Sequence, residues 1–239
     1  MVLRDAGVKV FDEIFKLIYA KLYDEWNGIN NPEYQLEFFA GDRSPGQVKR
    51  AISILLEGAK KRWAGVFEST DKIGMIDTHL KVCVSFLEKI KLLISNLRVI
   101  DEAFKYLIPK GSKKKEGQFF TPRPILDMVV KMLNPKAHEF IIDPNRGSAG
   151  FLLHSVKWFA GGVIIGKGLP VAVENFVQNN IYGIDFAKEA IKIAKAINII
   201  IGDGKSQIFG SGTNGDSLNP LLWNNEIKIA LRTRLLRFP

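Results

Sequence analysis

The stretch FIIDPNRGSAGFLLHSV, residues 140–156, constrains the fold of this chain more than any other part of the sequence. A short apolar run ends at Asp143, and the proline that follows stops further strand pairing because it has no N–H. Gly147 and Gly150 leave the turn without side-chain bulk, so a ligand can come close to the backbone. Ser148 is a candidate N-cap of the helical pattern that resumes here, and the free N–H groups of that helix suit an anion. The stretch predicts a strand, a tight turn and a helix, with a nucleotide-like ligand at the turn.

Short apolar runs alternate with helical patterns on both sides of this corner. We predict strands at 139–143, 180–185 and 206–210, and helices at 148–160 and 186–200. This alternation favours an α/β fold with a parallel, doubly wound sheet, whose ligands bind at the carboxyl ends of the strands. Asp185 ends the second predicted strand, where its carboxylate can accept from ribose hydroxyls or cap the next helix. The sequence leaves both roles open.

The N-terminal part of the chain carries helical periodicity instead. It covers 8–26, 43–63 and 77–107, with a break expected near Asn96. In the first segment the apolar stripe consists of Val8, Phe11, Ile14, Phe15, Ile18, Leu22 and Trp26. That stripe leaves a solvated face made of Asp12, Glu13, Lys16, Lys21 and Asp24. Ser44 fits the N-cap of the second helix and Pro45 its first position.

The segment 108–124 combines Pro, Gly and Ser with a lysine triplet, which is typical of a loop between domains. We therefore predict a helical domain over 1–110 and an α/β domain over 111–239. The lysine triplet could approach a nucleic-acid backbone, or it could be a solvated linker. Its members are Lys113, Lys114 and Lys115.

Composition narrows the class of protein. The formal net charge of +9 suits an anionic partner such as nucleic acid. No long uncharged apolar run is present and the N-terminus has charges where a signal peptide would be apolar, so we expect a soluble, cytoplasmic protein with no membrane contact. The three histidines are too widely spaced to predict a metal site. Cys83, the one cysteine, is expected to be a core thiol.

Four sequence blocks, after a helical N-terminal region, resemble the modification subunit of type I restriction-modification systems, a family of N6-adenine DNA methyltransferases. The blocks are residues 117–130, 141–153, 181–201 and 215–220. The resemblance implies a Rossmann-like sheet that binds S-adenosylmethionine and transfers its methyl group to adenine in DNA. It also implies a specificity subunit and a restriction subunit as partners, with sequence reading left to the specificity subunit.

The same resemblance implies roles for individual residues. Asp185 matches the ribose carboxylate, and Asp216 matches the residue that accepts from the adenine amino group. The segment that lies against the cofactor, with Thr121 near the methionyl end, corresponds to Gln118, Phe119, Phe120, Thr121 and Pro122. The cofactor loop corresponds to Asp143, Gly147, Ser148 and Gly150. Carboxylates and aromatic rings suit a cation, although the two phenylalanines could equally be interdomain packing.

The loop departs from the family pattern Asp-Pro-Ala-Cys-Gly-Ser-Gly-Gly-Phe at three positions. Asn145 and Arg146 replace Ala-Cys, and Ala149 replaces a glycine. Arg146 could pair with a carboxylate of the cofactor or could block the pocket. If position 149 needs a positive φ, alanine there costs about 1 kcal/mol and loosens the loop.

A further departure lies beyond Asp216. The family carries Asn-Pro-Pro-Phe/Tyr after its fourth strand, whereas here Asn219-Pro220-Leu221-Leu222 follows with neither the second proline nor the aromatic residue. We therefore expect the 239-residue chain alone to transfer no methyl group, with its catalytic residues unknown, and interpret its ending as truncated or frame-shifted. The alternative is a non-catalytic module that binds cofactor or DNA or assembles subunits.

Overall fold

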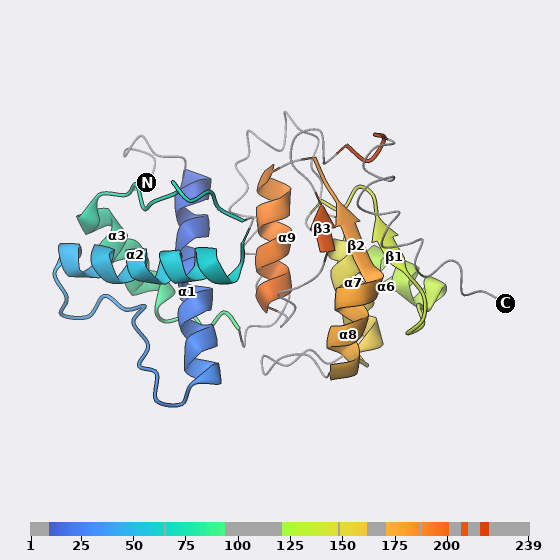
Figure 1. Cartoon of the computed structure of the whole chain (residues 1–239), viewed down its shortest axis with the longest axis horizontal. Coiled ribbons are helices and arrows are strands. Elements are labelled where there is room, and N and C mark those ends of the chain that lie inside the picture. The colour runs from blue at the N-terminus through green and yellow to red at the C-terminus, as the bar shows by residue number, and fades with distance from the viewer. Residues whose placement is uncertain are drawn as a thin grey trace. The chain divides into compact units, whose positions relative to one another are not determined.

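The computed structural model describes residues 10–64, 66–93, 121–147, 149–161, 171–186, 188–200, 207–209 and 216–219. The chain divides into two compact units, one built mainly on residues 1–118 and the other mainly on 119–239. Figure 1 labels the elements of both units. The predicted domain boundary at residues 110 and 111 lies outside the described residues and stays a prediction.

The described residues of the first unit form the helices α1 (Val10–Asn30), α2 (Pro45–Arg62) and α3 (Asp77–Leu87). The predicted start of α2 is confirmed. Ser44 is the N-cap, its hydroxyl accepts from Gln47 N, and the Gln47 side chain accepts from Ser44 N at 2.8 Å. Pro45 occupies the first turn, where a missing N–H costs nothing.

The core of the first unit forms where α1 packs on α2 and α2 packs on α3. The cluster includes Leu17, Ile52, Leu56 and Leu80, all fully or almost fully buried. Cys83 is half-buried and packs against this cluster, and burial raises the pKa of its thiol. Cys83 was predicted to be a core thiol, and it lies at the edge of this core and not within it.

The predicted solvated face of α1 is wrong. Glu13, Lys16, Lys21 and Asp24 are only 2–8% exposed. Their burial has a physical reason, because buried charges need hydrogen-bond partners and neighbouring loops supply them. Glu13 Oε2 accepts from Gly74 N at 2.9 Å, and its other oxygen pairs with Lys16 Nζ at 2.6 Å.

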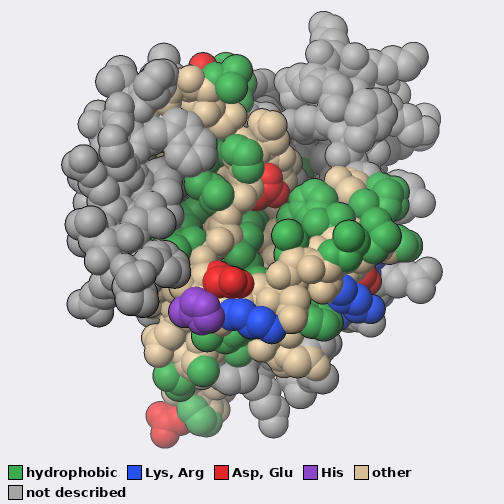
Figure 2. Space-filling view, turned by 90° about the vertical axis from the view of Figure 1, so that its right-hand side faces the viewer, with side chains coloured by type: hydrophobic (Ala, Val, Ile, Leu, Met, Phe, Trp, Pro, Cys, Tyr) green, Lys and Arg blue, Asp and Glu red, His purple; other side chains and the backbone are tan. Residues whose placement is uncertain are grey.

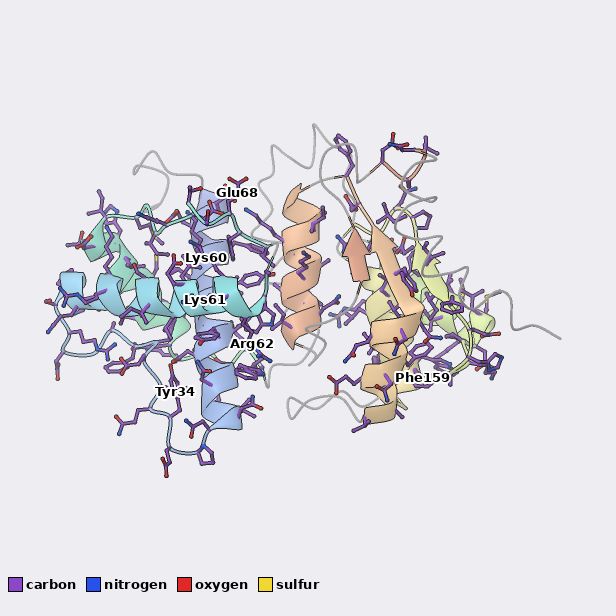
Figure 3. The ribbon with its side chains drawn as sticks, in the orientation of Figure 1. Tyr34, Lys60, Lys61, Arg62, Glu68 and Phe159 are labelled. Atoms are coloured by element: carbon purple, nitrogen blue, oxygen red, sulfur yellow. The ribbon has the colours of Figure 1, made fainter. Side chains whose placement is uncertain are left out.

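Asp24 also accepts three hydrogen bonds on this face of α1. Its two oxygens accept from the backbone N–H groups of Glu37 and Phe38, each at 2.9 Å, and from Tyr34 Oη at 2.8 Å. Tyr34 lies beside α1 from the loop that follows it (Figure 3). Burial raises the pKa of the Tyr34 phenol, and the hydrogen bond and charge of Asp24 raise it further. Asp24 therefore fixes the return of the chain after α1.

The third helix ends earlier than predicted. We expected a helix from 77 to a break near Asn96, but α3 ends at Leu87. The carboxylate of Glu25, on α1, accepts from Leu92 N at 3.0 Å and from Leu93 N at 2.8 Å. The N–H groups of Leu92 and Leu93 therefore donate to a side chain of α1. If α3 continued, they would instead donate to carbonyl groups within that helix. Residues 94–107 lie outside the described part of the chain.

The second unit contains a small parallel sheet with helices between its strands. Its elements, in chain order, are α6 (Arg123–Leu133), β1 (Ile141–Asp143), α7 (Gly150–Phe159), α8 (Val171–Asn180), β2 (Ile181–Ile184), α9 (Lys188–Ile200) and β3 (Gln207–Phe209). The strand order is β1-β2-β3, and both pairs are parallel. The three predicted strands and their two intervening helices are confirmed, whereas α6 and α8 were not predicted.

The helices of the second unit position the carboxyl ends of β1 and β2. Helix α7 packs on both strands, α6 packs on α7, and α8 contacts β2. The register pairs Asp143 with Gly183, so the loops that leave the two strands emerge at adjacent points of one edge. Among the described residues, no helix is long and apolar enough to cross a membrane and no group of side chains could hold a metal ion.

Candidate functional site at the ends of β1 and β2

Two backbone N–H groups hold the loop after β1 against the end of β2. Arg146 N donates to the carbonyl oxygen of Ile184 at 3.1 Å. Gly147 N donates to Asp185 Oδ2 at 2.6 Å, a short bond of the kind that a charged acceptor makes. The sequence placed Asp185 at a strand end with two possible roles, and the bond from Gly147 N is a further role that was not predicted. Its carboxylate fixes the glycine-containing loop.

Asp143 ends β1 on the other side of the same corner. Its Oδ1 accepts from Asn145 N at 3.1 Å, whereas its Oδ2 is buried without a hydrogen-bond partner in the described part of the structure. Burial raises the pKa of the Asp143 carboxyl, the bond from Asn145 and the charge of Arg146 oppose that rise, and the charge of Asp185 adds to it. The corner thus holds two interacting carboxylates.

The glycines of the loop have different structural roles. Gly147 has a φ of +53°, and a methyl group added there would meet no heavy atom within 4 Å apart from its chain neighbours. The space beside Gly147 is therefore open, as predicted for a ligand that approaches the backbone. A methyl group on Gly150 would lie 2.9 Å from Leu126 Cδ1, so Gly150 serves the packing of α7 on α6. This packing role was not predicted.

Ala149 has a positive φ, the conformation in which alanine at this position was expected to be strained. Its φ is +66° and ψ is +27°, the left-handed region, and the residue is fully buried. Ala149, and not Ser148, is the N-cap of α7, and it makes no side-chain capping bond. The predicted cap was wrong by one residue because the turn extends to Ala149 before the helix begins; Ser148 itself lies outside the described residues.

Replacing Ala149 with glycine is expected to raise the free energy of unfolding by about 0.5–1 kcal/mol. Relief of the left-handed strain, about 1–2 kcal/mol, exceeds the added entropy of the unfolded glycine, about 0.4–1 kcal/mol. Urea denaturation followed by circular dichroism measures the change. Ala51→Gly, inside α2, is the control and should destabilise by about 1 kcal/mol. Equal losses in both variants would contradict the strain at position 149.

Arg146 and Gly183 form a contact that the sequence analysis missed. Arg146 is 3% exposed, and a Cβ on Gly183 would lie 2.5 Å from Arg146 Cδ and 2.8 Å from Leu152 Cδ1. The stem of the arginine therefore packs on the backbone of β2, where only glycine leaves room. An isolated glycine inside a strand pattern is a signal of such a close approach, and "IYGID" contained it.

The other predicted site residues are not joined to this corner by any described contact. Thr121 and Pro122 are exposed, and Pro122 is the N-cap of α6. Asp216 is exposed and its Oδ1 accepts from Leu218 N at 2.9 Å, which closes its own turn. Predicted residues that lie outside the described part of the chain are Lys113, Lys114, Lys115, Gln118, Phe119, Phe120 and Ser148.

A second polar contact joins α6 and α7. His154 Nδ1 lies 2.6 Å from Asp127 Oδ1, with His154 buried and Asp127 exposed. Burial acts to raise the pKa of Asp127, but the hydrogen bond and charge of His154, with Lys157 and Lys131, bring it below its ordinary value. This pair fastens α6 to the helix that follows the glycine loop.

An open hollow of about 630 Å³ lies on α6, lined by Pro124, Asp127, Met128, Lys131 and Met132. Met128 and Met132 of α6 are exposed. Figure 2 shows a face of the protein on which hydrophobic side chains gather. Its described lining includes neither Asp143 nor Asp185 and comes from α6. Convergent polar groups mark ligand sites better than volume does, so the corner is the stronger candidate.

Comparison with known proteins identifies the family to which the chain is similar. The model of the family described as N-6 DNA Methylase matches residues 95–230. The chain is 24% identical over 177 residues to the type I restriction enzyme EcoKI methylase subunit of Escherichia coli (strain K12), covering 65% of this chain and 32% of that protein. It is 23% identical over 207 residues to the type I restriction enzyme MjaVIII methylase subunit of Methanocaldococcus jannaschii, covering 80% and 32%. The chain therefore spans about a third of the length of these relatives.

Proposed function

Because the chain belongs to the N-6 DNA methylase family, we propose that it is part of the modification subunit of a type I restriction-modification system. In this role it contributes to methyl transfer from S-adenosylmethionine to the N6 atom of adenine in DNA. The three described strands are then part of a Rossmann-like methyltransferase sheet. The observation that carries the proposal is the bond from Gly147 N to Asp185 Oδ2, which sets a glycine loop and a strand-end carboxylate at one corner.

The residues at the corner fit S-adenosylmethionine. Open space beside Gly147 admits a ligand, and Asp143 offers an oxygen without a described partner. The partly buried carboxylates of Asp143 and Asp185 suit ribose hydroxyls and the positive groups of the ligand. When bound, the cofactor would supply an electrophilic methyl group. The residues of this chain would bind and orient it, with Asp185 holding the loop in position.

The substrate and partners follow from the same proposal. The relatives are named as type I methylase subunits, which supports DNA as the substrate and the specificity and restriction subunits as partners. A net charge of +9 suits a DNA backbone, and Lys113, Lys114 and Lys115 remain candidates for contact with it. A subunit that acts on chromosomal DNA would work in the cytoplasm.

S-adenosylmethionine is expected to raise the melting temperature of the chain. At a concentration about tenfold above Kd, linkage gives about 1.4 kcal/mol, or a rise of roughly 3–6 °C. Asp185→Ala should remove most of this rise, because the loop loses the acceptor of Gly147 N and the ligand loses a carboxylate. Differential scanning fluorimetry with increasing ligand concentration measures both effects.

Asp71→Ala is the control for this experiment. Asp71 lies in an exposed turn of the first unit, where it accepts from Glu68 N, so its loss should leave the ligand-dependent rise unchanged. Titration calorimetry that detects no heat at millimolar S-adenosylmethionine would contradict the proposal. A rise that survives in Asp185→Ala would instead place the ligand elsewhere.

A further inference from the structure

The corner contains a buried cation of its own. Arg146 is 3% exposed, although it lies in a loop between two partly buried carboxylates, Asp143 and Asp185. Its backbone N–H bonds to Ile184, and its side-chain stem lies on Gly183, the residue paired with Asp143 in the sheet. The side chain is therefore directed into the protein, alongside the ends of the two strands that carry the carboxylates.

The charge of Arg146 acts on the groups around it. Burial is the largest cause that raises the pKa of Asp143, and the positive charge of Arg146 opposes it. Burial also lowers the pKa of Lys195 on α9, and the charge of Arg146 lowers it further. The carboxylate of Asp185 raises the pKa of Asp143, as expected for like charges at one corner. At Asp143, the positive charge of Arg146 thus acts against the negative charge of Asp185.

We propose that Arg146 sets the charge selectivity of the cofactor corner, acting as a built-in counter-cation to Asp143 and Asp185. The inference rests on the proposed function, because it concerns the adenosyl ligand of that site. With the guanidinium in place, a positive charge on the ligand adds little to the affinity of the corner for that ligand. It therefore binds the cationic sulfonium S-adenosylmethionine and the neutral thioether S-adenosylhomocysteine with similar affinity.

This selectivity has a consequence for the catalytic cycle. In a complete modification subunit, transfer of the methyl group forms a bond from the methyl carbon to adenine N6 and breaks the bond between that carbon and sulfur; the sulfur keeps the electron pair, N6 releases a proton to solvent, and the cationic ligand becomes neutral. A corner that depended on the charge of its ligand would release the neutral product readily. A corner with an internal cation retains it, so we expect loss of the arginine to weaken the binding of S-adenosylhomocysteine relative to that of S-adenosylmethionine.

The test compares two ligands in three forms of the 239-residue chain. Titration calorimetry gives the ratio of Kd for S-adenosylhomocysteine to Kd for S-adenosylmethionine in wild type, Arg146→Met and Arg146→Lys. The methionine is neutral and similar in length, whereas the lysine keeps the charge. We expect the ratio to rise by roughly tenfold in Arg146→Met, because the sulfonium becomes the cation nearest two uncompensated carboxylates. It should stay within about twofold of wild type in Arg146→Lys.

Arg62→Met is the matched control, since it removes an arginine that stacks on the Trp26 ring of the first unit. It should leave the ratio unchanged. The inference is overturned if all forms bind both ligands and Arg146→Met has the wild-type ratio, or if Arg146→Lys shifts as far as Arg146→Met. If wild type binds neither ligand, the proposed function fails, and with it the selectivity.

A second readout needs no ligand and tests the counter-cation itself. A carboxyl whose pKa is raised by folding destabilises the native state as pH rises above about 3.9, the value in the unfolded chain. Without the positive charge of Arg146 the pKa of Asp143 rises further, so this loss of stability increases. The melting temperature of Arg146→Met should therefore fall further below wild type at about pH 7.5 than at about pH 4.5. The same deficit at both pH values, or an equal pH dependence in Arg146→Lys, would show that the arginine contributes packing alone.

Discussion

Replacing Asp24 with alanine is expected to lower the free energy of unfolding by about 3–5 kcal/mol, the range found when one partner of a buried charged network is removed. Asp24 is 2% exposed and accepts from Tyr34 Oη and from the N–H groups of Glu37 and Phe38. Alanine leaves all three donors, which are buried or partly buried, without this acceptor. Urea denaturation followed at 222 nm measures the loss.

Two further variants separate the parts of this effect. Tyr34→Phe removes one donor and should cost about 1 kcal/mol, because the carboxylate keeps its two backbone partners. Asp42→Ala removes an exposed aspartate and should change stability by less than about 0.5 kcal/mol. If Asp24→Ala costs no more than Asp42→Ala, the buried network does not support the fold of this unit.

Gly183→Ala is expected to destabilise the second unit by about 2–3 kcal/mol, near the upper end of the usual cost of overpacking. The new methyl group would lie 2.5 Å from Arg146 Cδ and 2.8 Å from Leu152 Cδ1, so the loop or α7 must move. Because that loop carries Gly147 and its bond to Asp185, we also expect ligand binding at the corner to weaken. Denaturation and titration of the same sample measure both effects.

A double-mutant cycle identifies the cause. Arg146→Ala removes the nearest clashing atoms, so the combination of Arg146→Ala and Gly183→Ala should lose less stability than the sum of the two single variants. Gly46→Ala is the control, because its nearest contact would be Asp77 Oδ2 at 3.9 Å and alanine favours the helix there. Strict additivity in the cycle would exclude the contact between Arg146 and the β2 backbone.

The sheet was predictable because each of its strands is a short apolar run that ends at a turn signal or a carboxylate. Pro144 cannot pair, so the end of β1 at Asp143 was placed correctly, whereas β2 ends at Ile184, one residue before the predicted end at Asp185. Helix α6 was missed because its first residues, Arg123 and Pro124, were assigned to the loop before it. A proline in the first turn is compatible with a helix, and that signal was available.

The wrong prediction for α1 shows that sequence periodicity cannot identify charged residues that are buried against distant parts of the chain. A charged residue opposite an apolar stripe is usually solvated, and the amphipathic pattern of α1 gave no reason to place Glu13 or Asp24 inside. Their partners are backbone N–H groups that lie 13–62 residues further along the chain. Backbone donors have no sequence signature, so only the folded structure identifies them.

At the candidate site, too, local sequence rules indicated some residues, whereas the contacts between them became known only from the fold. Asp143, Gly147 and Asp185 were proposed as site residues from the sequence, because their positions around two strand ends follow from local rules. The bond between Gly147 and Asp185, the packing of Leu126 on Gly150 and the burial of Arg146 depend on contacts across the fold. The sequence indicated only that alanine at position 149 would be strained if its φ were positive, and in the structure its φ is positive.

The buried carboxylates of α1 also define which surface residues of the first unit are free to change. Glu13, Asp24 and Glu25 bind main-chain N–H groups, including those of Glu37, Gly74 and Leu92, and make no demand on the side chains at these positions. Nineteen of the twenty amino acids offer that N–H, and proline alone does not. The side chains of the loops around α1 can therefore vary in the chemistry that they present to other molecules, while the buried carboxylates of α1 keep the backbone of these loops on the same path.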